Sequence, residues 1–240
     1  MSTYSITIQM NTNTVDELLS NGFNLYGFQA VKGALNGVPT VWFQTGNYSL
    51  ETVITWSDQY QAYTSLSQII PHGRIVANST YVISPGQTLE VTSSSGMGNV
   101  MATGVTGAIA ILNQTSTQFT CGISAELPGS GFAPVCAFPL FGFNMDVIAP
   151  AQQVFLMFSN FLVNAGTVIE GSFSEGILID LSSNASPTVS FDINMGWSAA
   201  GGGSTTYPPD TNLVPLLIQQ EGGPAALREL PAHSQKTESR

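Results

Sequence analysis

Basic residues are scarce in this chain. Of its five Lys and Arg residues, only Lys32 and Arg74 lie between Met1 and Leu217, against twelve acidic residues in the same stretch. Binding to nucleic acid requires several basic side chains, because they must neutralise phosphates and release counterions. The scarcity therefore predicts no nucleic-acid partner. It also argues against electrostatic docking on anionic lipid, and it leaves open a zwitterionic lipid headgroup or a neutral sugar.

Charge of either sign is rare. Charged residues make up 8% of the 240-residue chain, where a soluble domain has about 25%. The 43% hydrophobic fraction is ordinary, so uncharged polar residues must cover the surface. The length suits one β-sandwich domain, which we place at residues 1–219. The polar, Pro- and Gly-punctuated residues 220–240 predict a flexible C-terminal tail.

Signals for export, membrane insertion and common catalysis are missing. The N-terminus lacks a basic segment followed by an apolar one, and no apolar run reaches the ~18 residues of a transmembrane helix. We therefore expect cytoplasmic synthesis without a signal peptide, with release by another route left open. Only His72 precedes the tail, and there is no G-x-S-x-G elbow, Lys-bearing phosphate loop or His/Cys cluster. We predict no catalytic residue, no metal and no cofactor.

The two cysteines, Cys121 and Cys136, flank a segment rich in Pro and Gly. A disulfide between them would close a loop of about 15 residues and add about 3 kcal/mol of stability. Cytosolic synthesis favours reduced thiols instead. The sequence leaves both states open.

Strand patterns dominate the chain. In residues 4–10, Tyr4, Ile6, Ile8 and Met10 alternate with polar residues, as in a strand with one buried face. Residues 153–158 are apolar at almost every position, which predicts a central strand covered on both sides. We count about ten such segments separated by turn residues. The predicted fold is all-β: an antiparallel β-sandwich, jelly-roll-like, with one short N-terminal helix.

That helix is predicted from Val15 to about Ser20. Thr14 and Glu17 form a capping-box pattern, and Gly22 stands where a C-terminal cap belongs. Near the C-terminus, residues 212–218 resemble a last edge strand interrupted by Pro215.

Aromatic side chains gather between residues 40 and 65. In an extended conformation, Trp56, Asp58 and Tyr60 share one face. Aromatic rings beside a carboxylate suit a sugar ring or a quaternary ammonium. Our candidate ligand-binding residues are Trp56, Asp58, Tyr60, Tyr63, Tyr48 and Asn47. The alternative interpretation is that these aromatics form part of the sandwich core.

An enzymatic alternative comes from a resemblance. The stretch "WFQTG", residues 42–46, with the strands that follow it, resembles the strand order of the glutamic peptidases, which are β-sandwich proteases. The resemblance implies that Gln44 is catalytic together with a Glu, but no Glu stands in an apolar strand at the expected place. Independently, Glu170 and Glu175 bracket a short turn, which offers two neighbouring carboxylates as an alternative acid/base pair.

Our leading hypothesis is a non-enzymatic β-sandwich protein that binds a neutral or zwitterionic ligand, either a carbohydrate or a choline-type lipid headgroup. Its composition is similar to that of cytosolic lectins and of small pore-forming toxins. The alternatives are a self-assembling structural subunit, which would form homo-oligomers through sheet edges, and the hydrolase described above.

Overall fold

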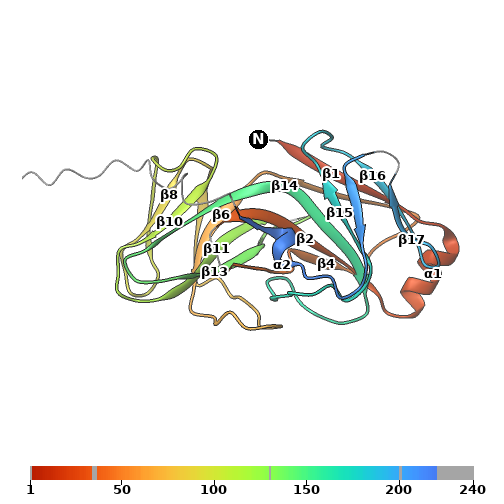
Figure 1. Cartoon of the computed structure of the whole chain (residues 1–240), viewed down its shortest axis with the longest axis horizontal. Coiled ribbons are helices and arrows are strands. Elements are labelled where there is room, and N and C mark those ends of the chain that lie inside the picture. The colour runs from red at the N-terminus through yellow and green to blue at the C-terminus, as the bar shows by residue number, and fades with distance from the viewer. Residues whose placement is uncertain (1, 34–36, 130, 200–201, 221–240) are drawn as a thin grey trace, which may run out of the picture.

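The protein is an elongated all-β molecule with two short helices, as a computed structural model shows for residues 2–33, 37–129, 131–199 and 202–220 (Figure 1). The predicted all-β, sandwich-like class is confirmed. The described residues contain nineteen strand segments rather than about ten. Several are only two to four residues long, which is too short for a period-2 pattern to reveal.

The first of three sheets has four strands. Their order is β17 (Gly196–Ala199), β16 (Thr188–Asp192), β1 (Thr3–Gln9) and β5 (Glu51–Ser57). β1 is antiparallel to β5 and parallel to β16. The alternation predicted for β1 is confirmed, because Ile6 and Ile8 are fully buried and Met10 is nearly so.

The second sheet has nine strands and runs the length of the molecule. Its main path is β18 (Ser204–Tyr207), β15 (Gly176–Asp180), β14 (Met145–Ser159), β10 (Ile109–Asn113), β8 (Thr88–Val91) and β9 (Gly98–Met101). β2 (Asn24–Gly33) also pairs with β14, and β4 (Phe43–Thr45) and β19 (Ile218–Gln220) pair with β2. Residues 154–159 of β14 are all buried, as predicted for a central strand.

The third sheet has six strands. Its order is β3 (Val38–Pro39), β13 (Cys136–Leu140), β11 (Phe119–Glu126), β6 (Tyr60–Ser65) and β7 (Ser79–Ile83), and β12 (Phe132–Pro134) also pairs with β11.

The long strand β14 connects the two ends of the molecule. In Figure 1 the third sheet lies beside β8 and β10 at one end, and the first sheet lies beside β15 at the other. The largest cluster of buried apolar residues takes members from all three sheets. The fold is therefore two sandwich-like halves that share one curled sheet, and their junction lies near the middle of β14.

The N-terminal helix begins earlier than predicted. α1 spans Thr12–Ser20, and its N-cap is Asn11, whose side chain accepts a hydrogen bond from Thr14 N at 2.8 Å. The predicted capping box is wrong, because the Thr14 hydroxyl instead accepts from Ile193 N at 3.1 Å. The predicted end is confirmed: Gly22 follows the C-cap with φ +67°, a conformation that glycine adopts without strain.

The C-terminal part of the body also differs from its prediction. Residues Val214–Leu217 form a second short helix, α2, and only Ile218–Gln220 pair as a strand, β19, alongside β2. Pro215 sits in the first turn of α2, where its missing N–H breaks no hydrogen bond. The predicted flexible tail lies outside the described residues, apart from Gln220. Neither described helix is long and apolar enough to cross a membrane.

Candidate binding site

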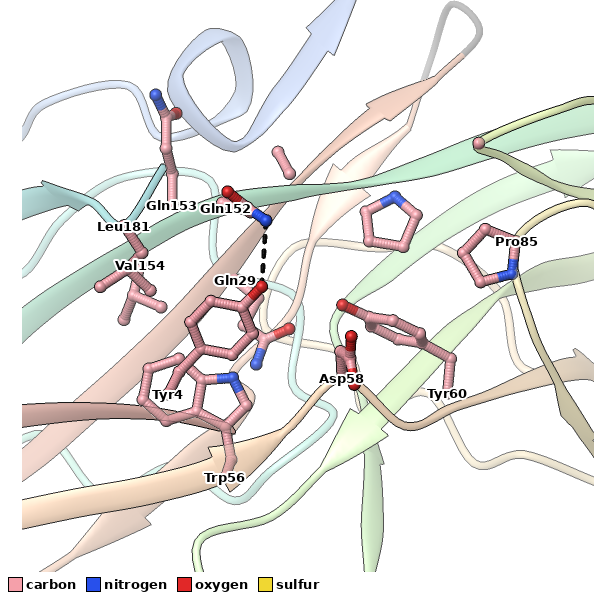
Figure 2. A pocket seen from close by; sticks show the side chains of 13 residues that line it. Tyr4, Gln29, Trp56, Asp58, Tyr60, Pro85, Gln152, Gln153, Val154 and Leu181 are labelled. Atoms are coloured by element: carbon pink, nitrogen blue, oxygen red, sulfur yellow. Dashed lines mark hydrogen bonds between the residues drawn. The ribbon is translucent and has the colours of Figure 1, made fainter. Parts of the chain in front are cut away.

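A pocket of about 170 Å³ lies where the two halves of the molecule meet (Figure 2). All three sheets reach it. Tyr4 and Trp56 come from the first sheet, Gln29 and residues 150–154 from the second, and Tyr60 from the third, while Asp58 lies in the connection between β5 and β6. Pro85 and Gly107, from two turns, and Leu181, just after β15, complete the wall. The volume is below the ~300 Å³ at which drug-sized ligand pockets begin, so the site suits a small ligand.

Tyr4 and Trp56 form the aromatic side of the pocket. They are directly opposite each other on β1 and β5, and their rings stack with centroids 5.7 Å apart and planes at 22°. Trp42 packs edge-on against Trp56 at 5.0 Å. Because both neighbours cover the indole, Trp56 is only 6% exposed and is largely a core residue.

Asp58 and Tyr60 form the polar side. The Asp58 carboxylate accepts a hydrogen bond from Ser2 N at 2.7 Å, and Asp58 N donates to Ser2 O at 3.1 Å. Together these two hydrogen bonds hold Asp58 in place at the edge of the pocket. Burial, with smaller contributions from Asp58 and Tyr4, raises the pKa of Tyr60 far above its usual range. The Tyr60 phenol therefore remains a hydrogen-bond donor at any physiological pH.

An irregularity in β14 shapes the remaining wall. The pairing of β14 with β2 shifts register between Pro150 and Val154. Such bulges redirect side chains and are frequent beside functional sites. Here the shift brings Gln152 over the pocket, where its Nε2 donates to Tyr4 Oη at 3.0 Å (Figure 2).

Gln29 is the most unusual residue of the lining. Its side chain is 6% exposed, and its Nε2 atom is buried with no hydrogen-bond partner among the described residues. Figure 2 shows its amide between Tyr4, Trp56 and Asp58. An unpaired buried amide costs about 1–3 kcal/mol, so the pocket favours a ligand that accepts a hydrogen bond from Gln29 Nε2.

A second layer of hydrogen bonds holds the connection that carries Asp58. The Glu126 carboxylate on β11 accepts from both the backbone amide and the hydroxyl of Ser57. Gln59 Nε2 donates to Ser57 Oγ at 3.0 Å, and Trp42 Nε1 donates to Glu126 O at 2.9 Å. The two residues that flank Asp58 are thus fixed to a central strand, and the pocket is preorganised.

The structure brings together three of the six candidate ligand-binding residues: Trp56, Asp58 and Tyr60. The other three lie elsewhere. Tyr63 is fully buried, and its hydroxyl donates to Cys136 O at 2.7 Å, so it does not share an exposed edge with Asp58. Tyr48 is also buried, and its hydroxyl donates a hydrogen bond to Phe23 O. Asn47 is exposed in the turn after β4.

The amides of the lining, Gln29, Gln152 and Gln153, are absent from the sequence-based set. One signal for Gln29 was available: it is the single amide side chain within the otherwise apolar run from Leu25 to Val31. The two β14 glutamines carry no such signal, because only the register shift directs them to the pocket.

Gln44, the residue singled out by the glutamic peptidase resemblance, opens on a different groove. That groove is lined by residues 43, 44, 74, 127–129, 164 and 165, and none of these described residues carries a carboxylate. Glu170 is exposed, whereas the Glu175 carboxylate accepts from Trp197 N at 2.7 Å. No hydrogen bond joins Glu170 to Glu175, both of which lie in the described chain.

Both cysteines are free and fully buried. Cys121 is opposite Phe138 on the neighbouring strand, so Cys136 lies two residues away along β13 rather than directly across. Cys121 Sγ approaches Asp146 Oδ2 at 3.4 Å. Burial raises the pKa of Asp146, and the bond from Cys121 opposes this shift.

Asp146→Asn is expected to raise the melting temperature at pH 7 by a few degrees. The folded pKa of this carboxyl lies above its unfolded value of about 3.9. The protein therefore loses stability as the pH rises through the folded pKa, because the charged form of the carboxyl is poorly solvated where it is buried. The variant should therefore flatten the decline in stability from acidic to neutral pH. Thermal unfolding of both proteins across that range measures the effect, and parallel pH profiles would contradict it.

Comparisons of the chain with protein-family models, with curated proteins and with solved structures found no match. The functional argument therefore depends on the geometry of the pocket.

Proposed function

We propose that the protein binds a small neutral or zwitterionic ligand, without catalysis, in the pocket between Tyr4, Gln29, Asp58 and Tyr60. The Gln29 side chain is the observation that carries this proposal. A buried amide without a partner is unfavourable for folding, and here it lines a preorganised pocket.

The chemistry of the lining favours binding over catalysis. Among the described residues, the lining contains one carboxylate, Asp58, and no His, Cys, Ser or Lys. Nucleophilic catalysis needs a nucleophile with a base beside it, and acid/base hydrolysis needs two groups with opposite roles. Amides, phenols and a single carboxylate instead provide orientation and hydrogen bonding.

Filling the pocket provides a test that does not depend on the identity of the ligand. Ala151 lines the pocket in the irregular part of β14, so Ala151→Phe should place a ring in the ligand volume. With neutral hexoses and phosphocholine as probes and tryptophan fluorescence as readout, we expect the wild type to bind at least one probe. We expect the filled variant to lose at least about tenfold in affinity.

Ala199→Phe, at the exposed end of β17, is the matched control and should bind like the wild type. Gln29→Leu, which removes the unpaired amide, tests the same site without adding volume and should also weaken binding. Circular dichroism of each variant verifies folding. Absence of binding by every probe, or unchanged binding by both pocket variants, would reject the proposal.

A further inference from the structure

We infer that the ligand is an uncharged sugar, held by a pair of neighbouring hydroxyl groups between Gln29, Asp58 and Tyr60. This inference rests on the proposed function and narrows it to one chemical class. It also predicts which sugars the pocket rejects.

The lining places donors and acceptors close together. Tyr60 offers a phenol donor, Gln29 offers an amide with no partner at Nε2, and Asp58 offers carboxylate oxygens that only accept. Figure 2 shows these three groups facing a common space. A hydroxyl group donates and accepts at once, so neighbouring sugar hydroxyls can donate to Asp58 while they accept from Gln29 or Tyr60.

A choline headgroup fits the same groups poorly. A quaternary ammonium is held by open aromatic faces, but Tyr4 stacks on Trp56 and Trp42 packs edge-on against it. Such a cation also accepts no hydrogen bond, and it would leave the Gln29 amide unpaired. A phosphate attached to it would meet Asp58 in a lining whose described residues include no Lys or Arg.

The same charge distribution predicts selectivity among sugars. Among the described residues of the lining, Asp58 is the only one with a charged side chain, in a protein of net charge −10. A hexuronic acid has the ring and hydroxyls of the corresponding hexose but carries a carboxylate. Like charges in a partly buried site repel, so the pocket should accept the hexose and reject the acid.

The test pairs methyl glycosides of glucose, galactose and mannose with the corresponding hexuronic acids, and adds phosphocholine. Tryptophan fluorescence titrations at low and high salt measure each affinity. We expect at least one neutral glycoside to bind at least about tenfold more tightly than its acid partner. Salt should reduce this ratio, because it screens partly exposed charges.

Asp58→Asn isolates the role of the carboxylate. The variant should weaken binding of the neutral sugar by about tenfold or more, because hydrogen bonds to a charged group are the stronger ones. It should also bring the ratio of the two affinities, for the neutral sugar and for its hexuronic acid, close to one. Glu51→Gln removes the same charge at the exposed start of β5, and it should leave both quantities unchanged.

The outcomes separate this inference from the proposed function. Phosphocholine binding that Ala151→Phe abolishes, without sugar binding, would overturn the sugar inference and keep the pocket as a ligand site. Equal affinity for a hexose and its acid in the wild type would also overturn it. If no probe binds, both proposals fail.

Discussion

Trp42→Ala should lower the free energy of unfolding by about 3–5 kcal/mol, the usual cost of removing a large buried aromatic side chain. Trp42 is fully buried and packs edge-on against both Phe43 and Trp56, with ring centroids 5.0 Å apart in each case. Its indole also donates to Glu126 O. The substitution therefore opens a cavity and leaves a carbonyl without its donor.

The substitution should also weaken ligand binding in the pocket. Trp42 packs against Trp56, and Glu126 accepts a hydrogen bond from Ser57, the residue before Asp58. Urea unfolding measures stability, and ligand titration under native conditions measures the pocket. Phe143→Ala removes a ring that is 74% exposed and should change stability by less than about 0.5 kcal/mol. Similar losses in the two variants would show that Trp42 does not support the core as described.

The aromatic stretch illustrates how far the sequence predicts the site. Alternation placed Trp56, Asp58 and Tyr60 on one face, and the structure brings them into one pocket. The reason differs from the prediction, since the strand does not continue through Asp58. β5 ends at Ser57 in one sheet, and β6 begins at Tyr60 in another. The change of sheet also explains why Tyr63 is buried. It belongs to β6 of the third sheet, where its hydroxyl bonds Cys136 O, a contact that alternation along the sequence cannot predict.

The rest of the pocket depends on contacts between distant parts of the chain. Gln152 reaches Tyr4, 148 residues away, only because the β14–β2 pairing shifts register beside it. A local pattern does not determine the register of two strands separated by more than a hundred residues, because packing sets it. The aromatic half of the site was therefore predictable, whereas the amide half was not.

The alternative of self-assembly also depends on tertiary structure. It needs an exposed sheet edge, and β7 is the last strand on one side of the third sheet, with Val82 74% exposed. An apolar residue on an unpaired edge is where strand-to-strand association begins. Composition alone predicted association without a location, and the topology makes β7 one of the sheet edges at which to look for it, together with β5 and β9.

Gly122→Ala should destabilise the protein by about 3–5 kcal/mol, although it adds a single methyl group. Gly122 lies in β11, between β6 and β13. A Cβ at this position would lie 2.2 Å from Cys136 O and 2.8 Å from Tyr63 Oη. The first neighbour is backbone, so β11 and β13 must separate. The second is the hydroxyl that bonds Cys136 O at 2.7 Å, so that buried bond breaks as well.

Urea unfolding of matched variants separates these two causes. Gly171→Ala is the control, since a Cβ there would have no neighbour within 4 Å and its effect should stay within about 0.5 kcal/mol. Tyr63→Phe removes the phenol oxygen, but it keeps the Cys136 carbonyl and the ring carbon Cε1, which would lie 2.9 Å from the new Cβ. In the Tyr63→Phe background, Gly122→Ala should therefore cost less stability than in the wild type but still destabilise the protein. Full recovery would mean that the phenol, rather than the approach of the two strands, requires glycine at this position. Because β6 carries Tyr60 at its start and pairs with β11 through Tyr60 and Ala125, the same separation should weaken ligand binding in the single variant.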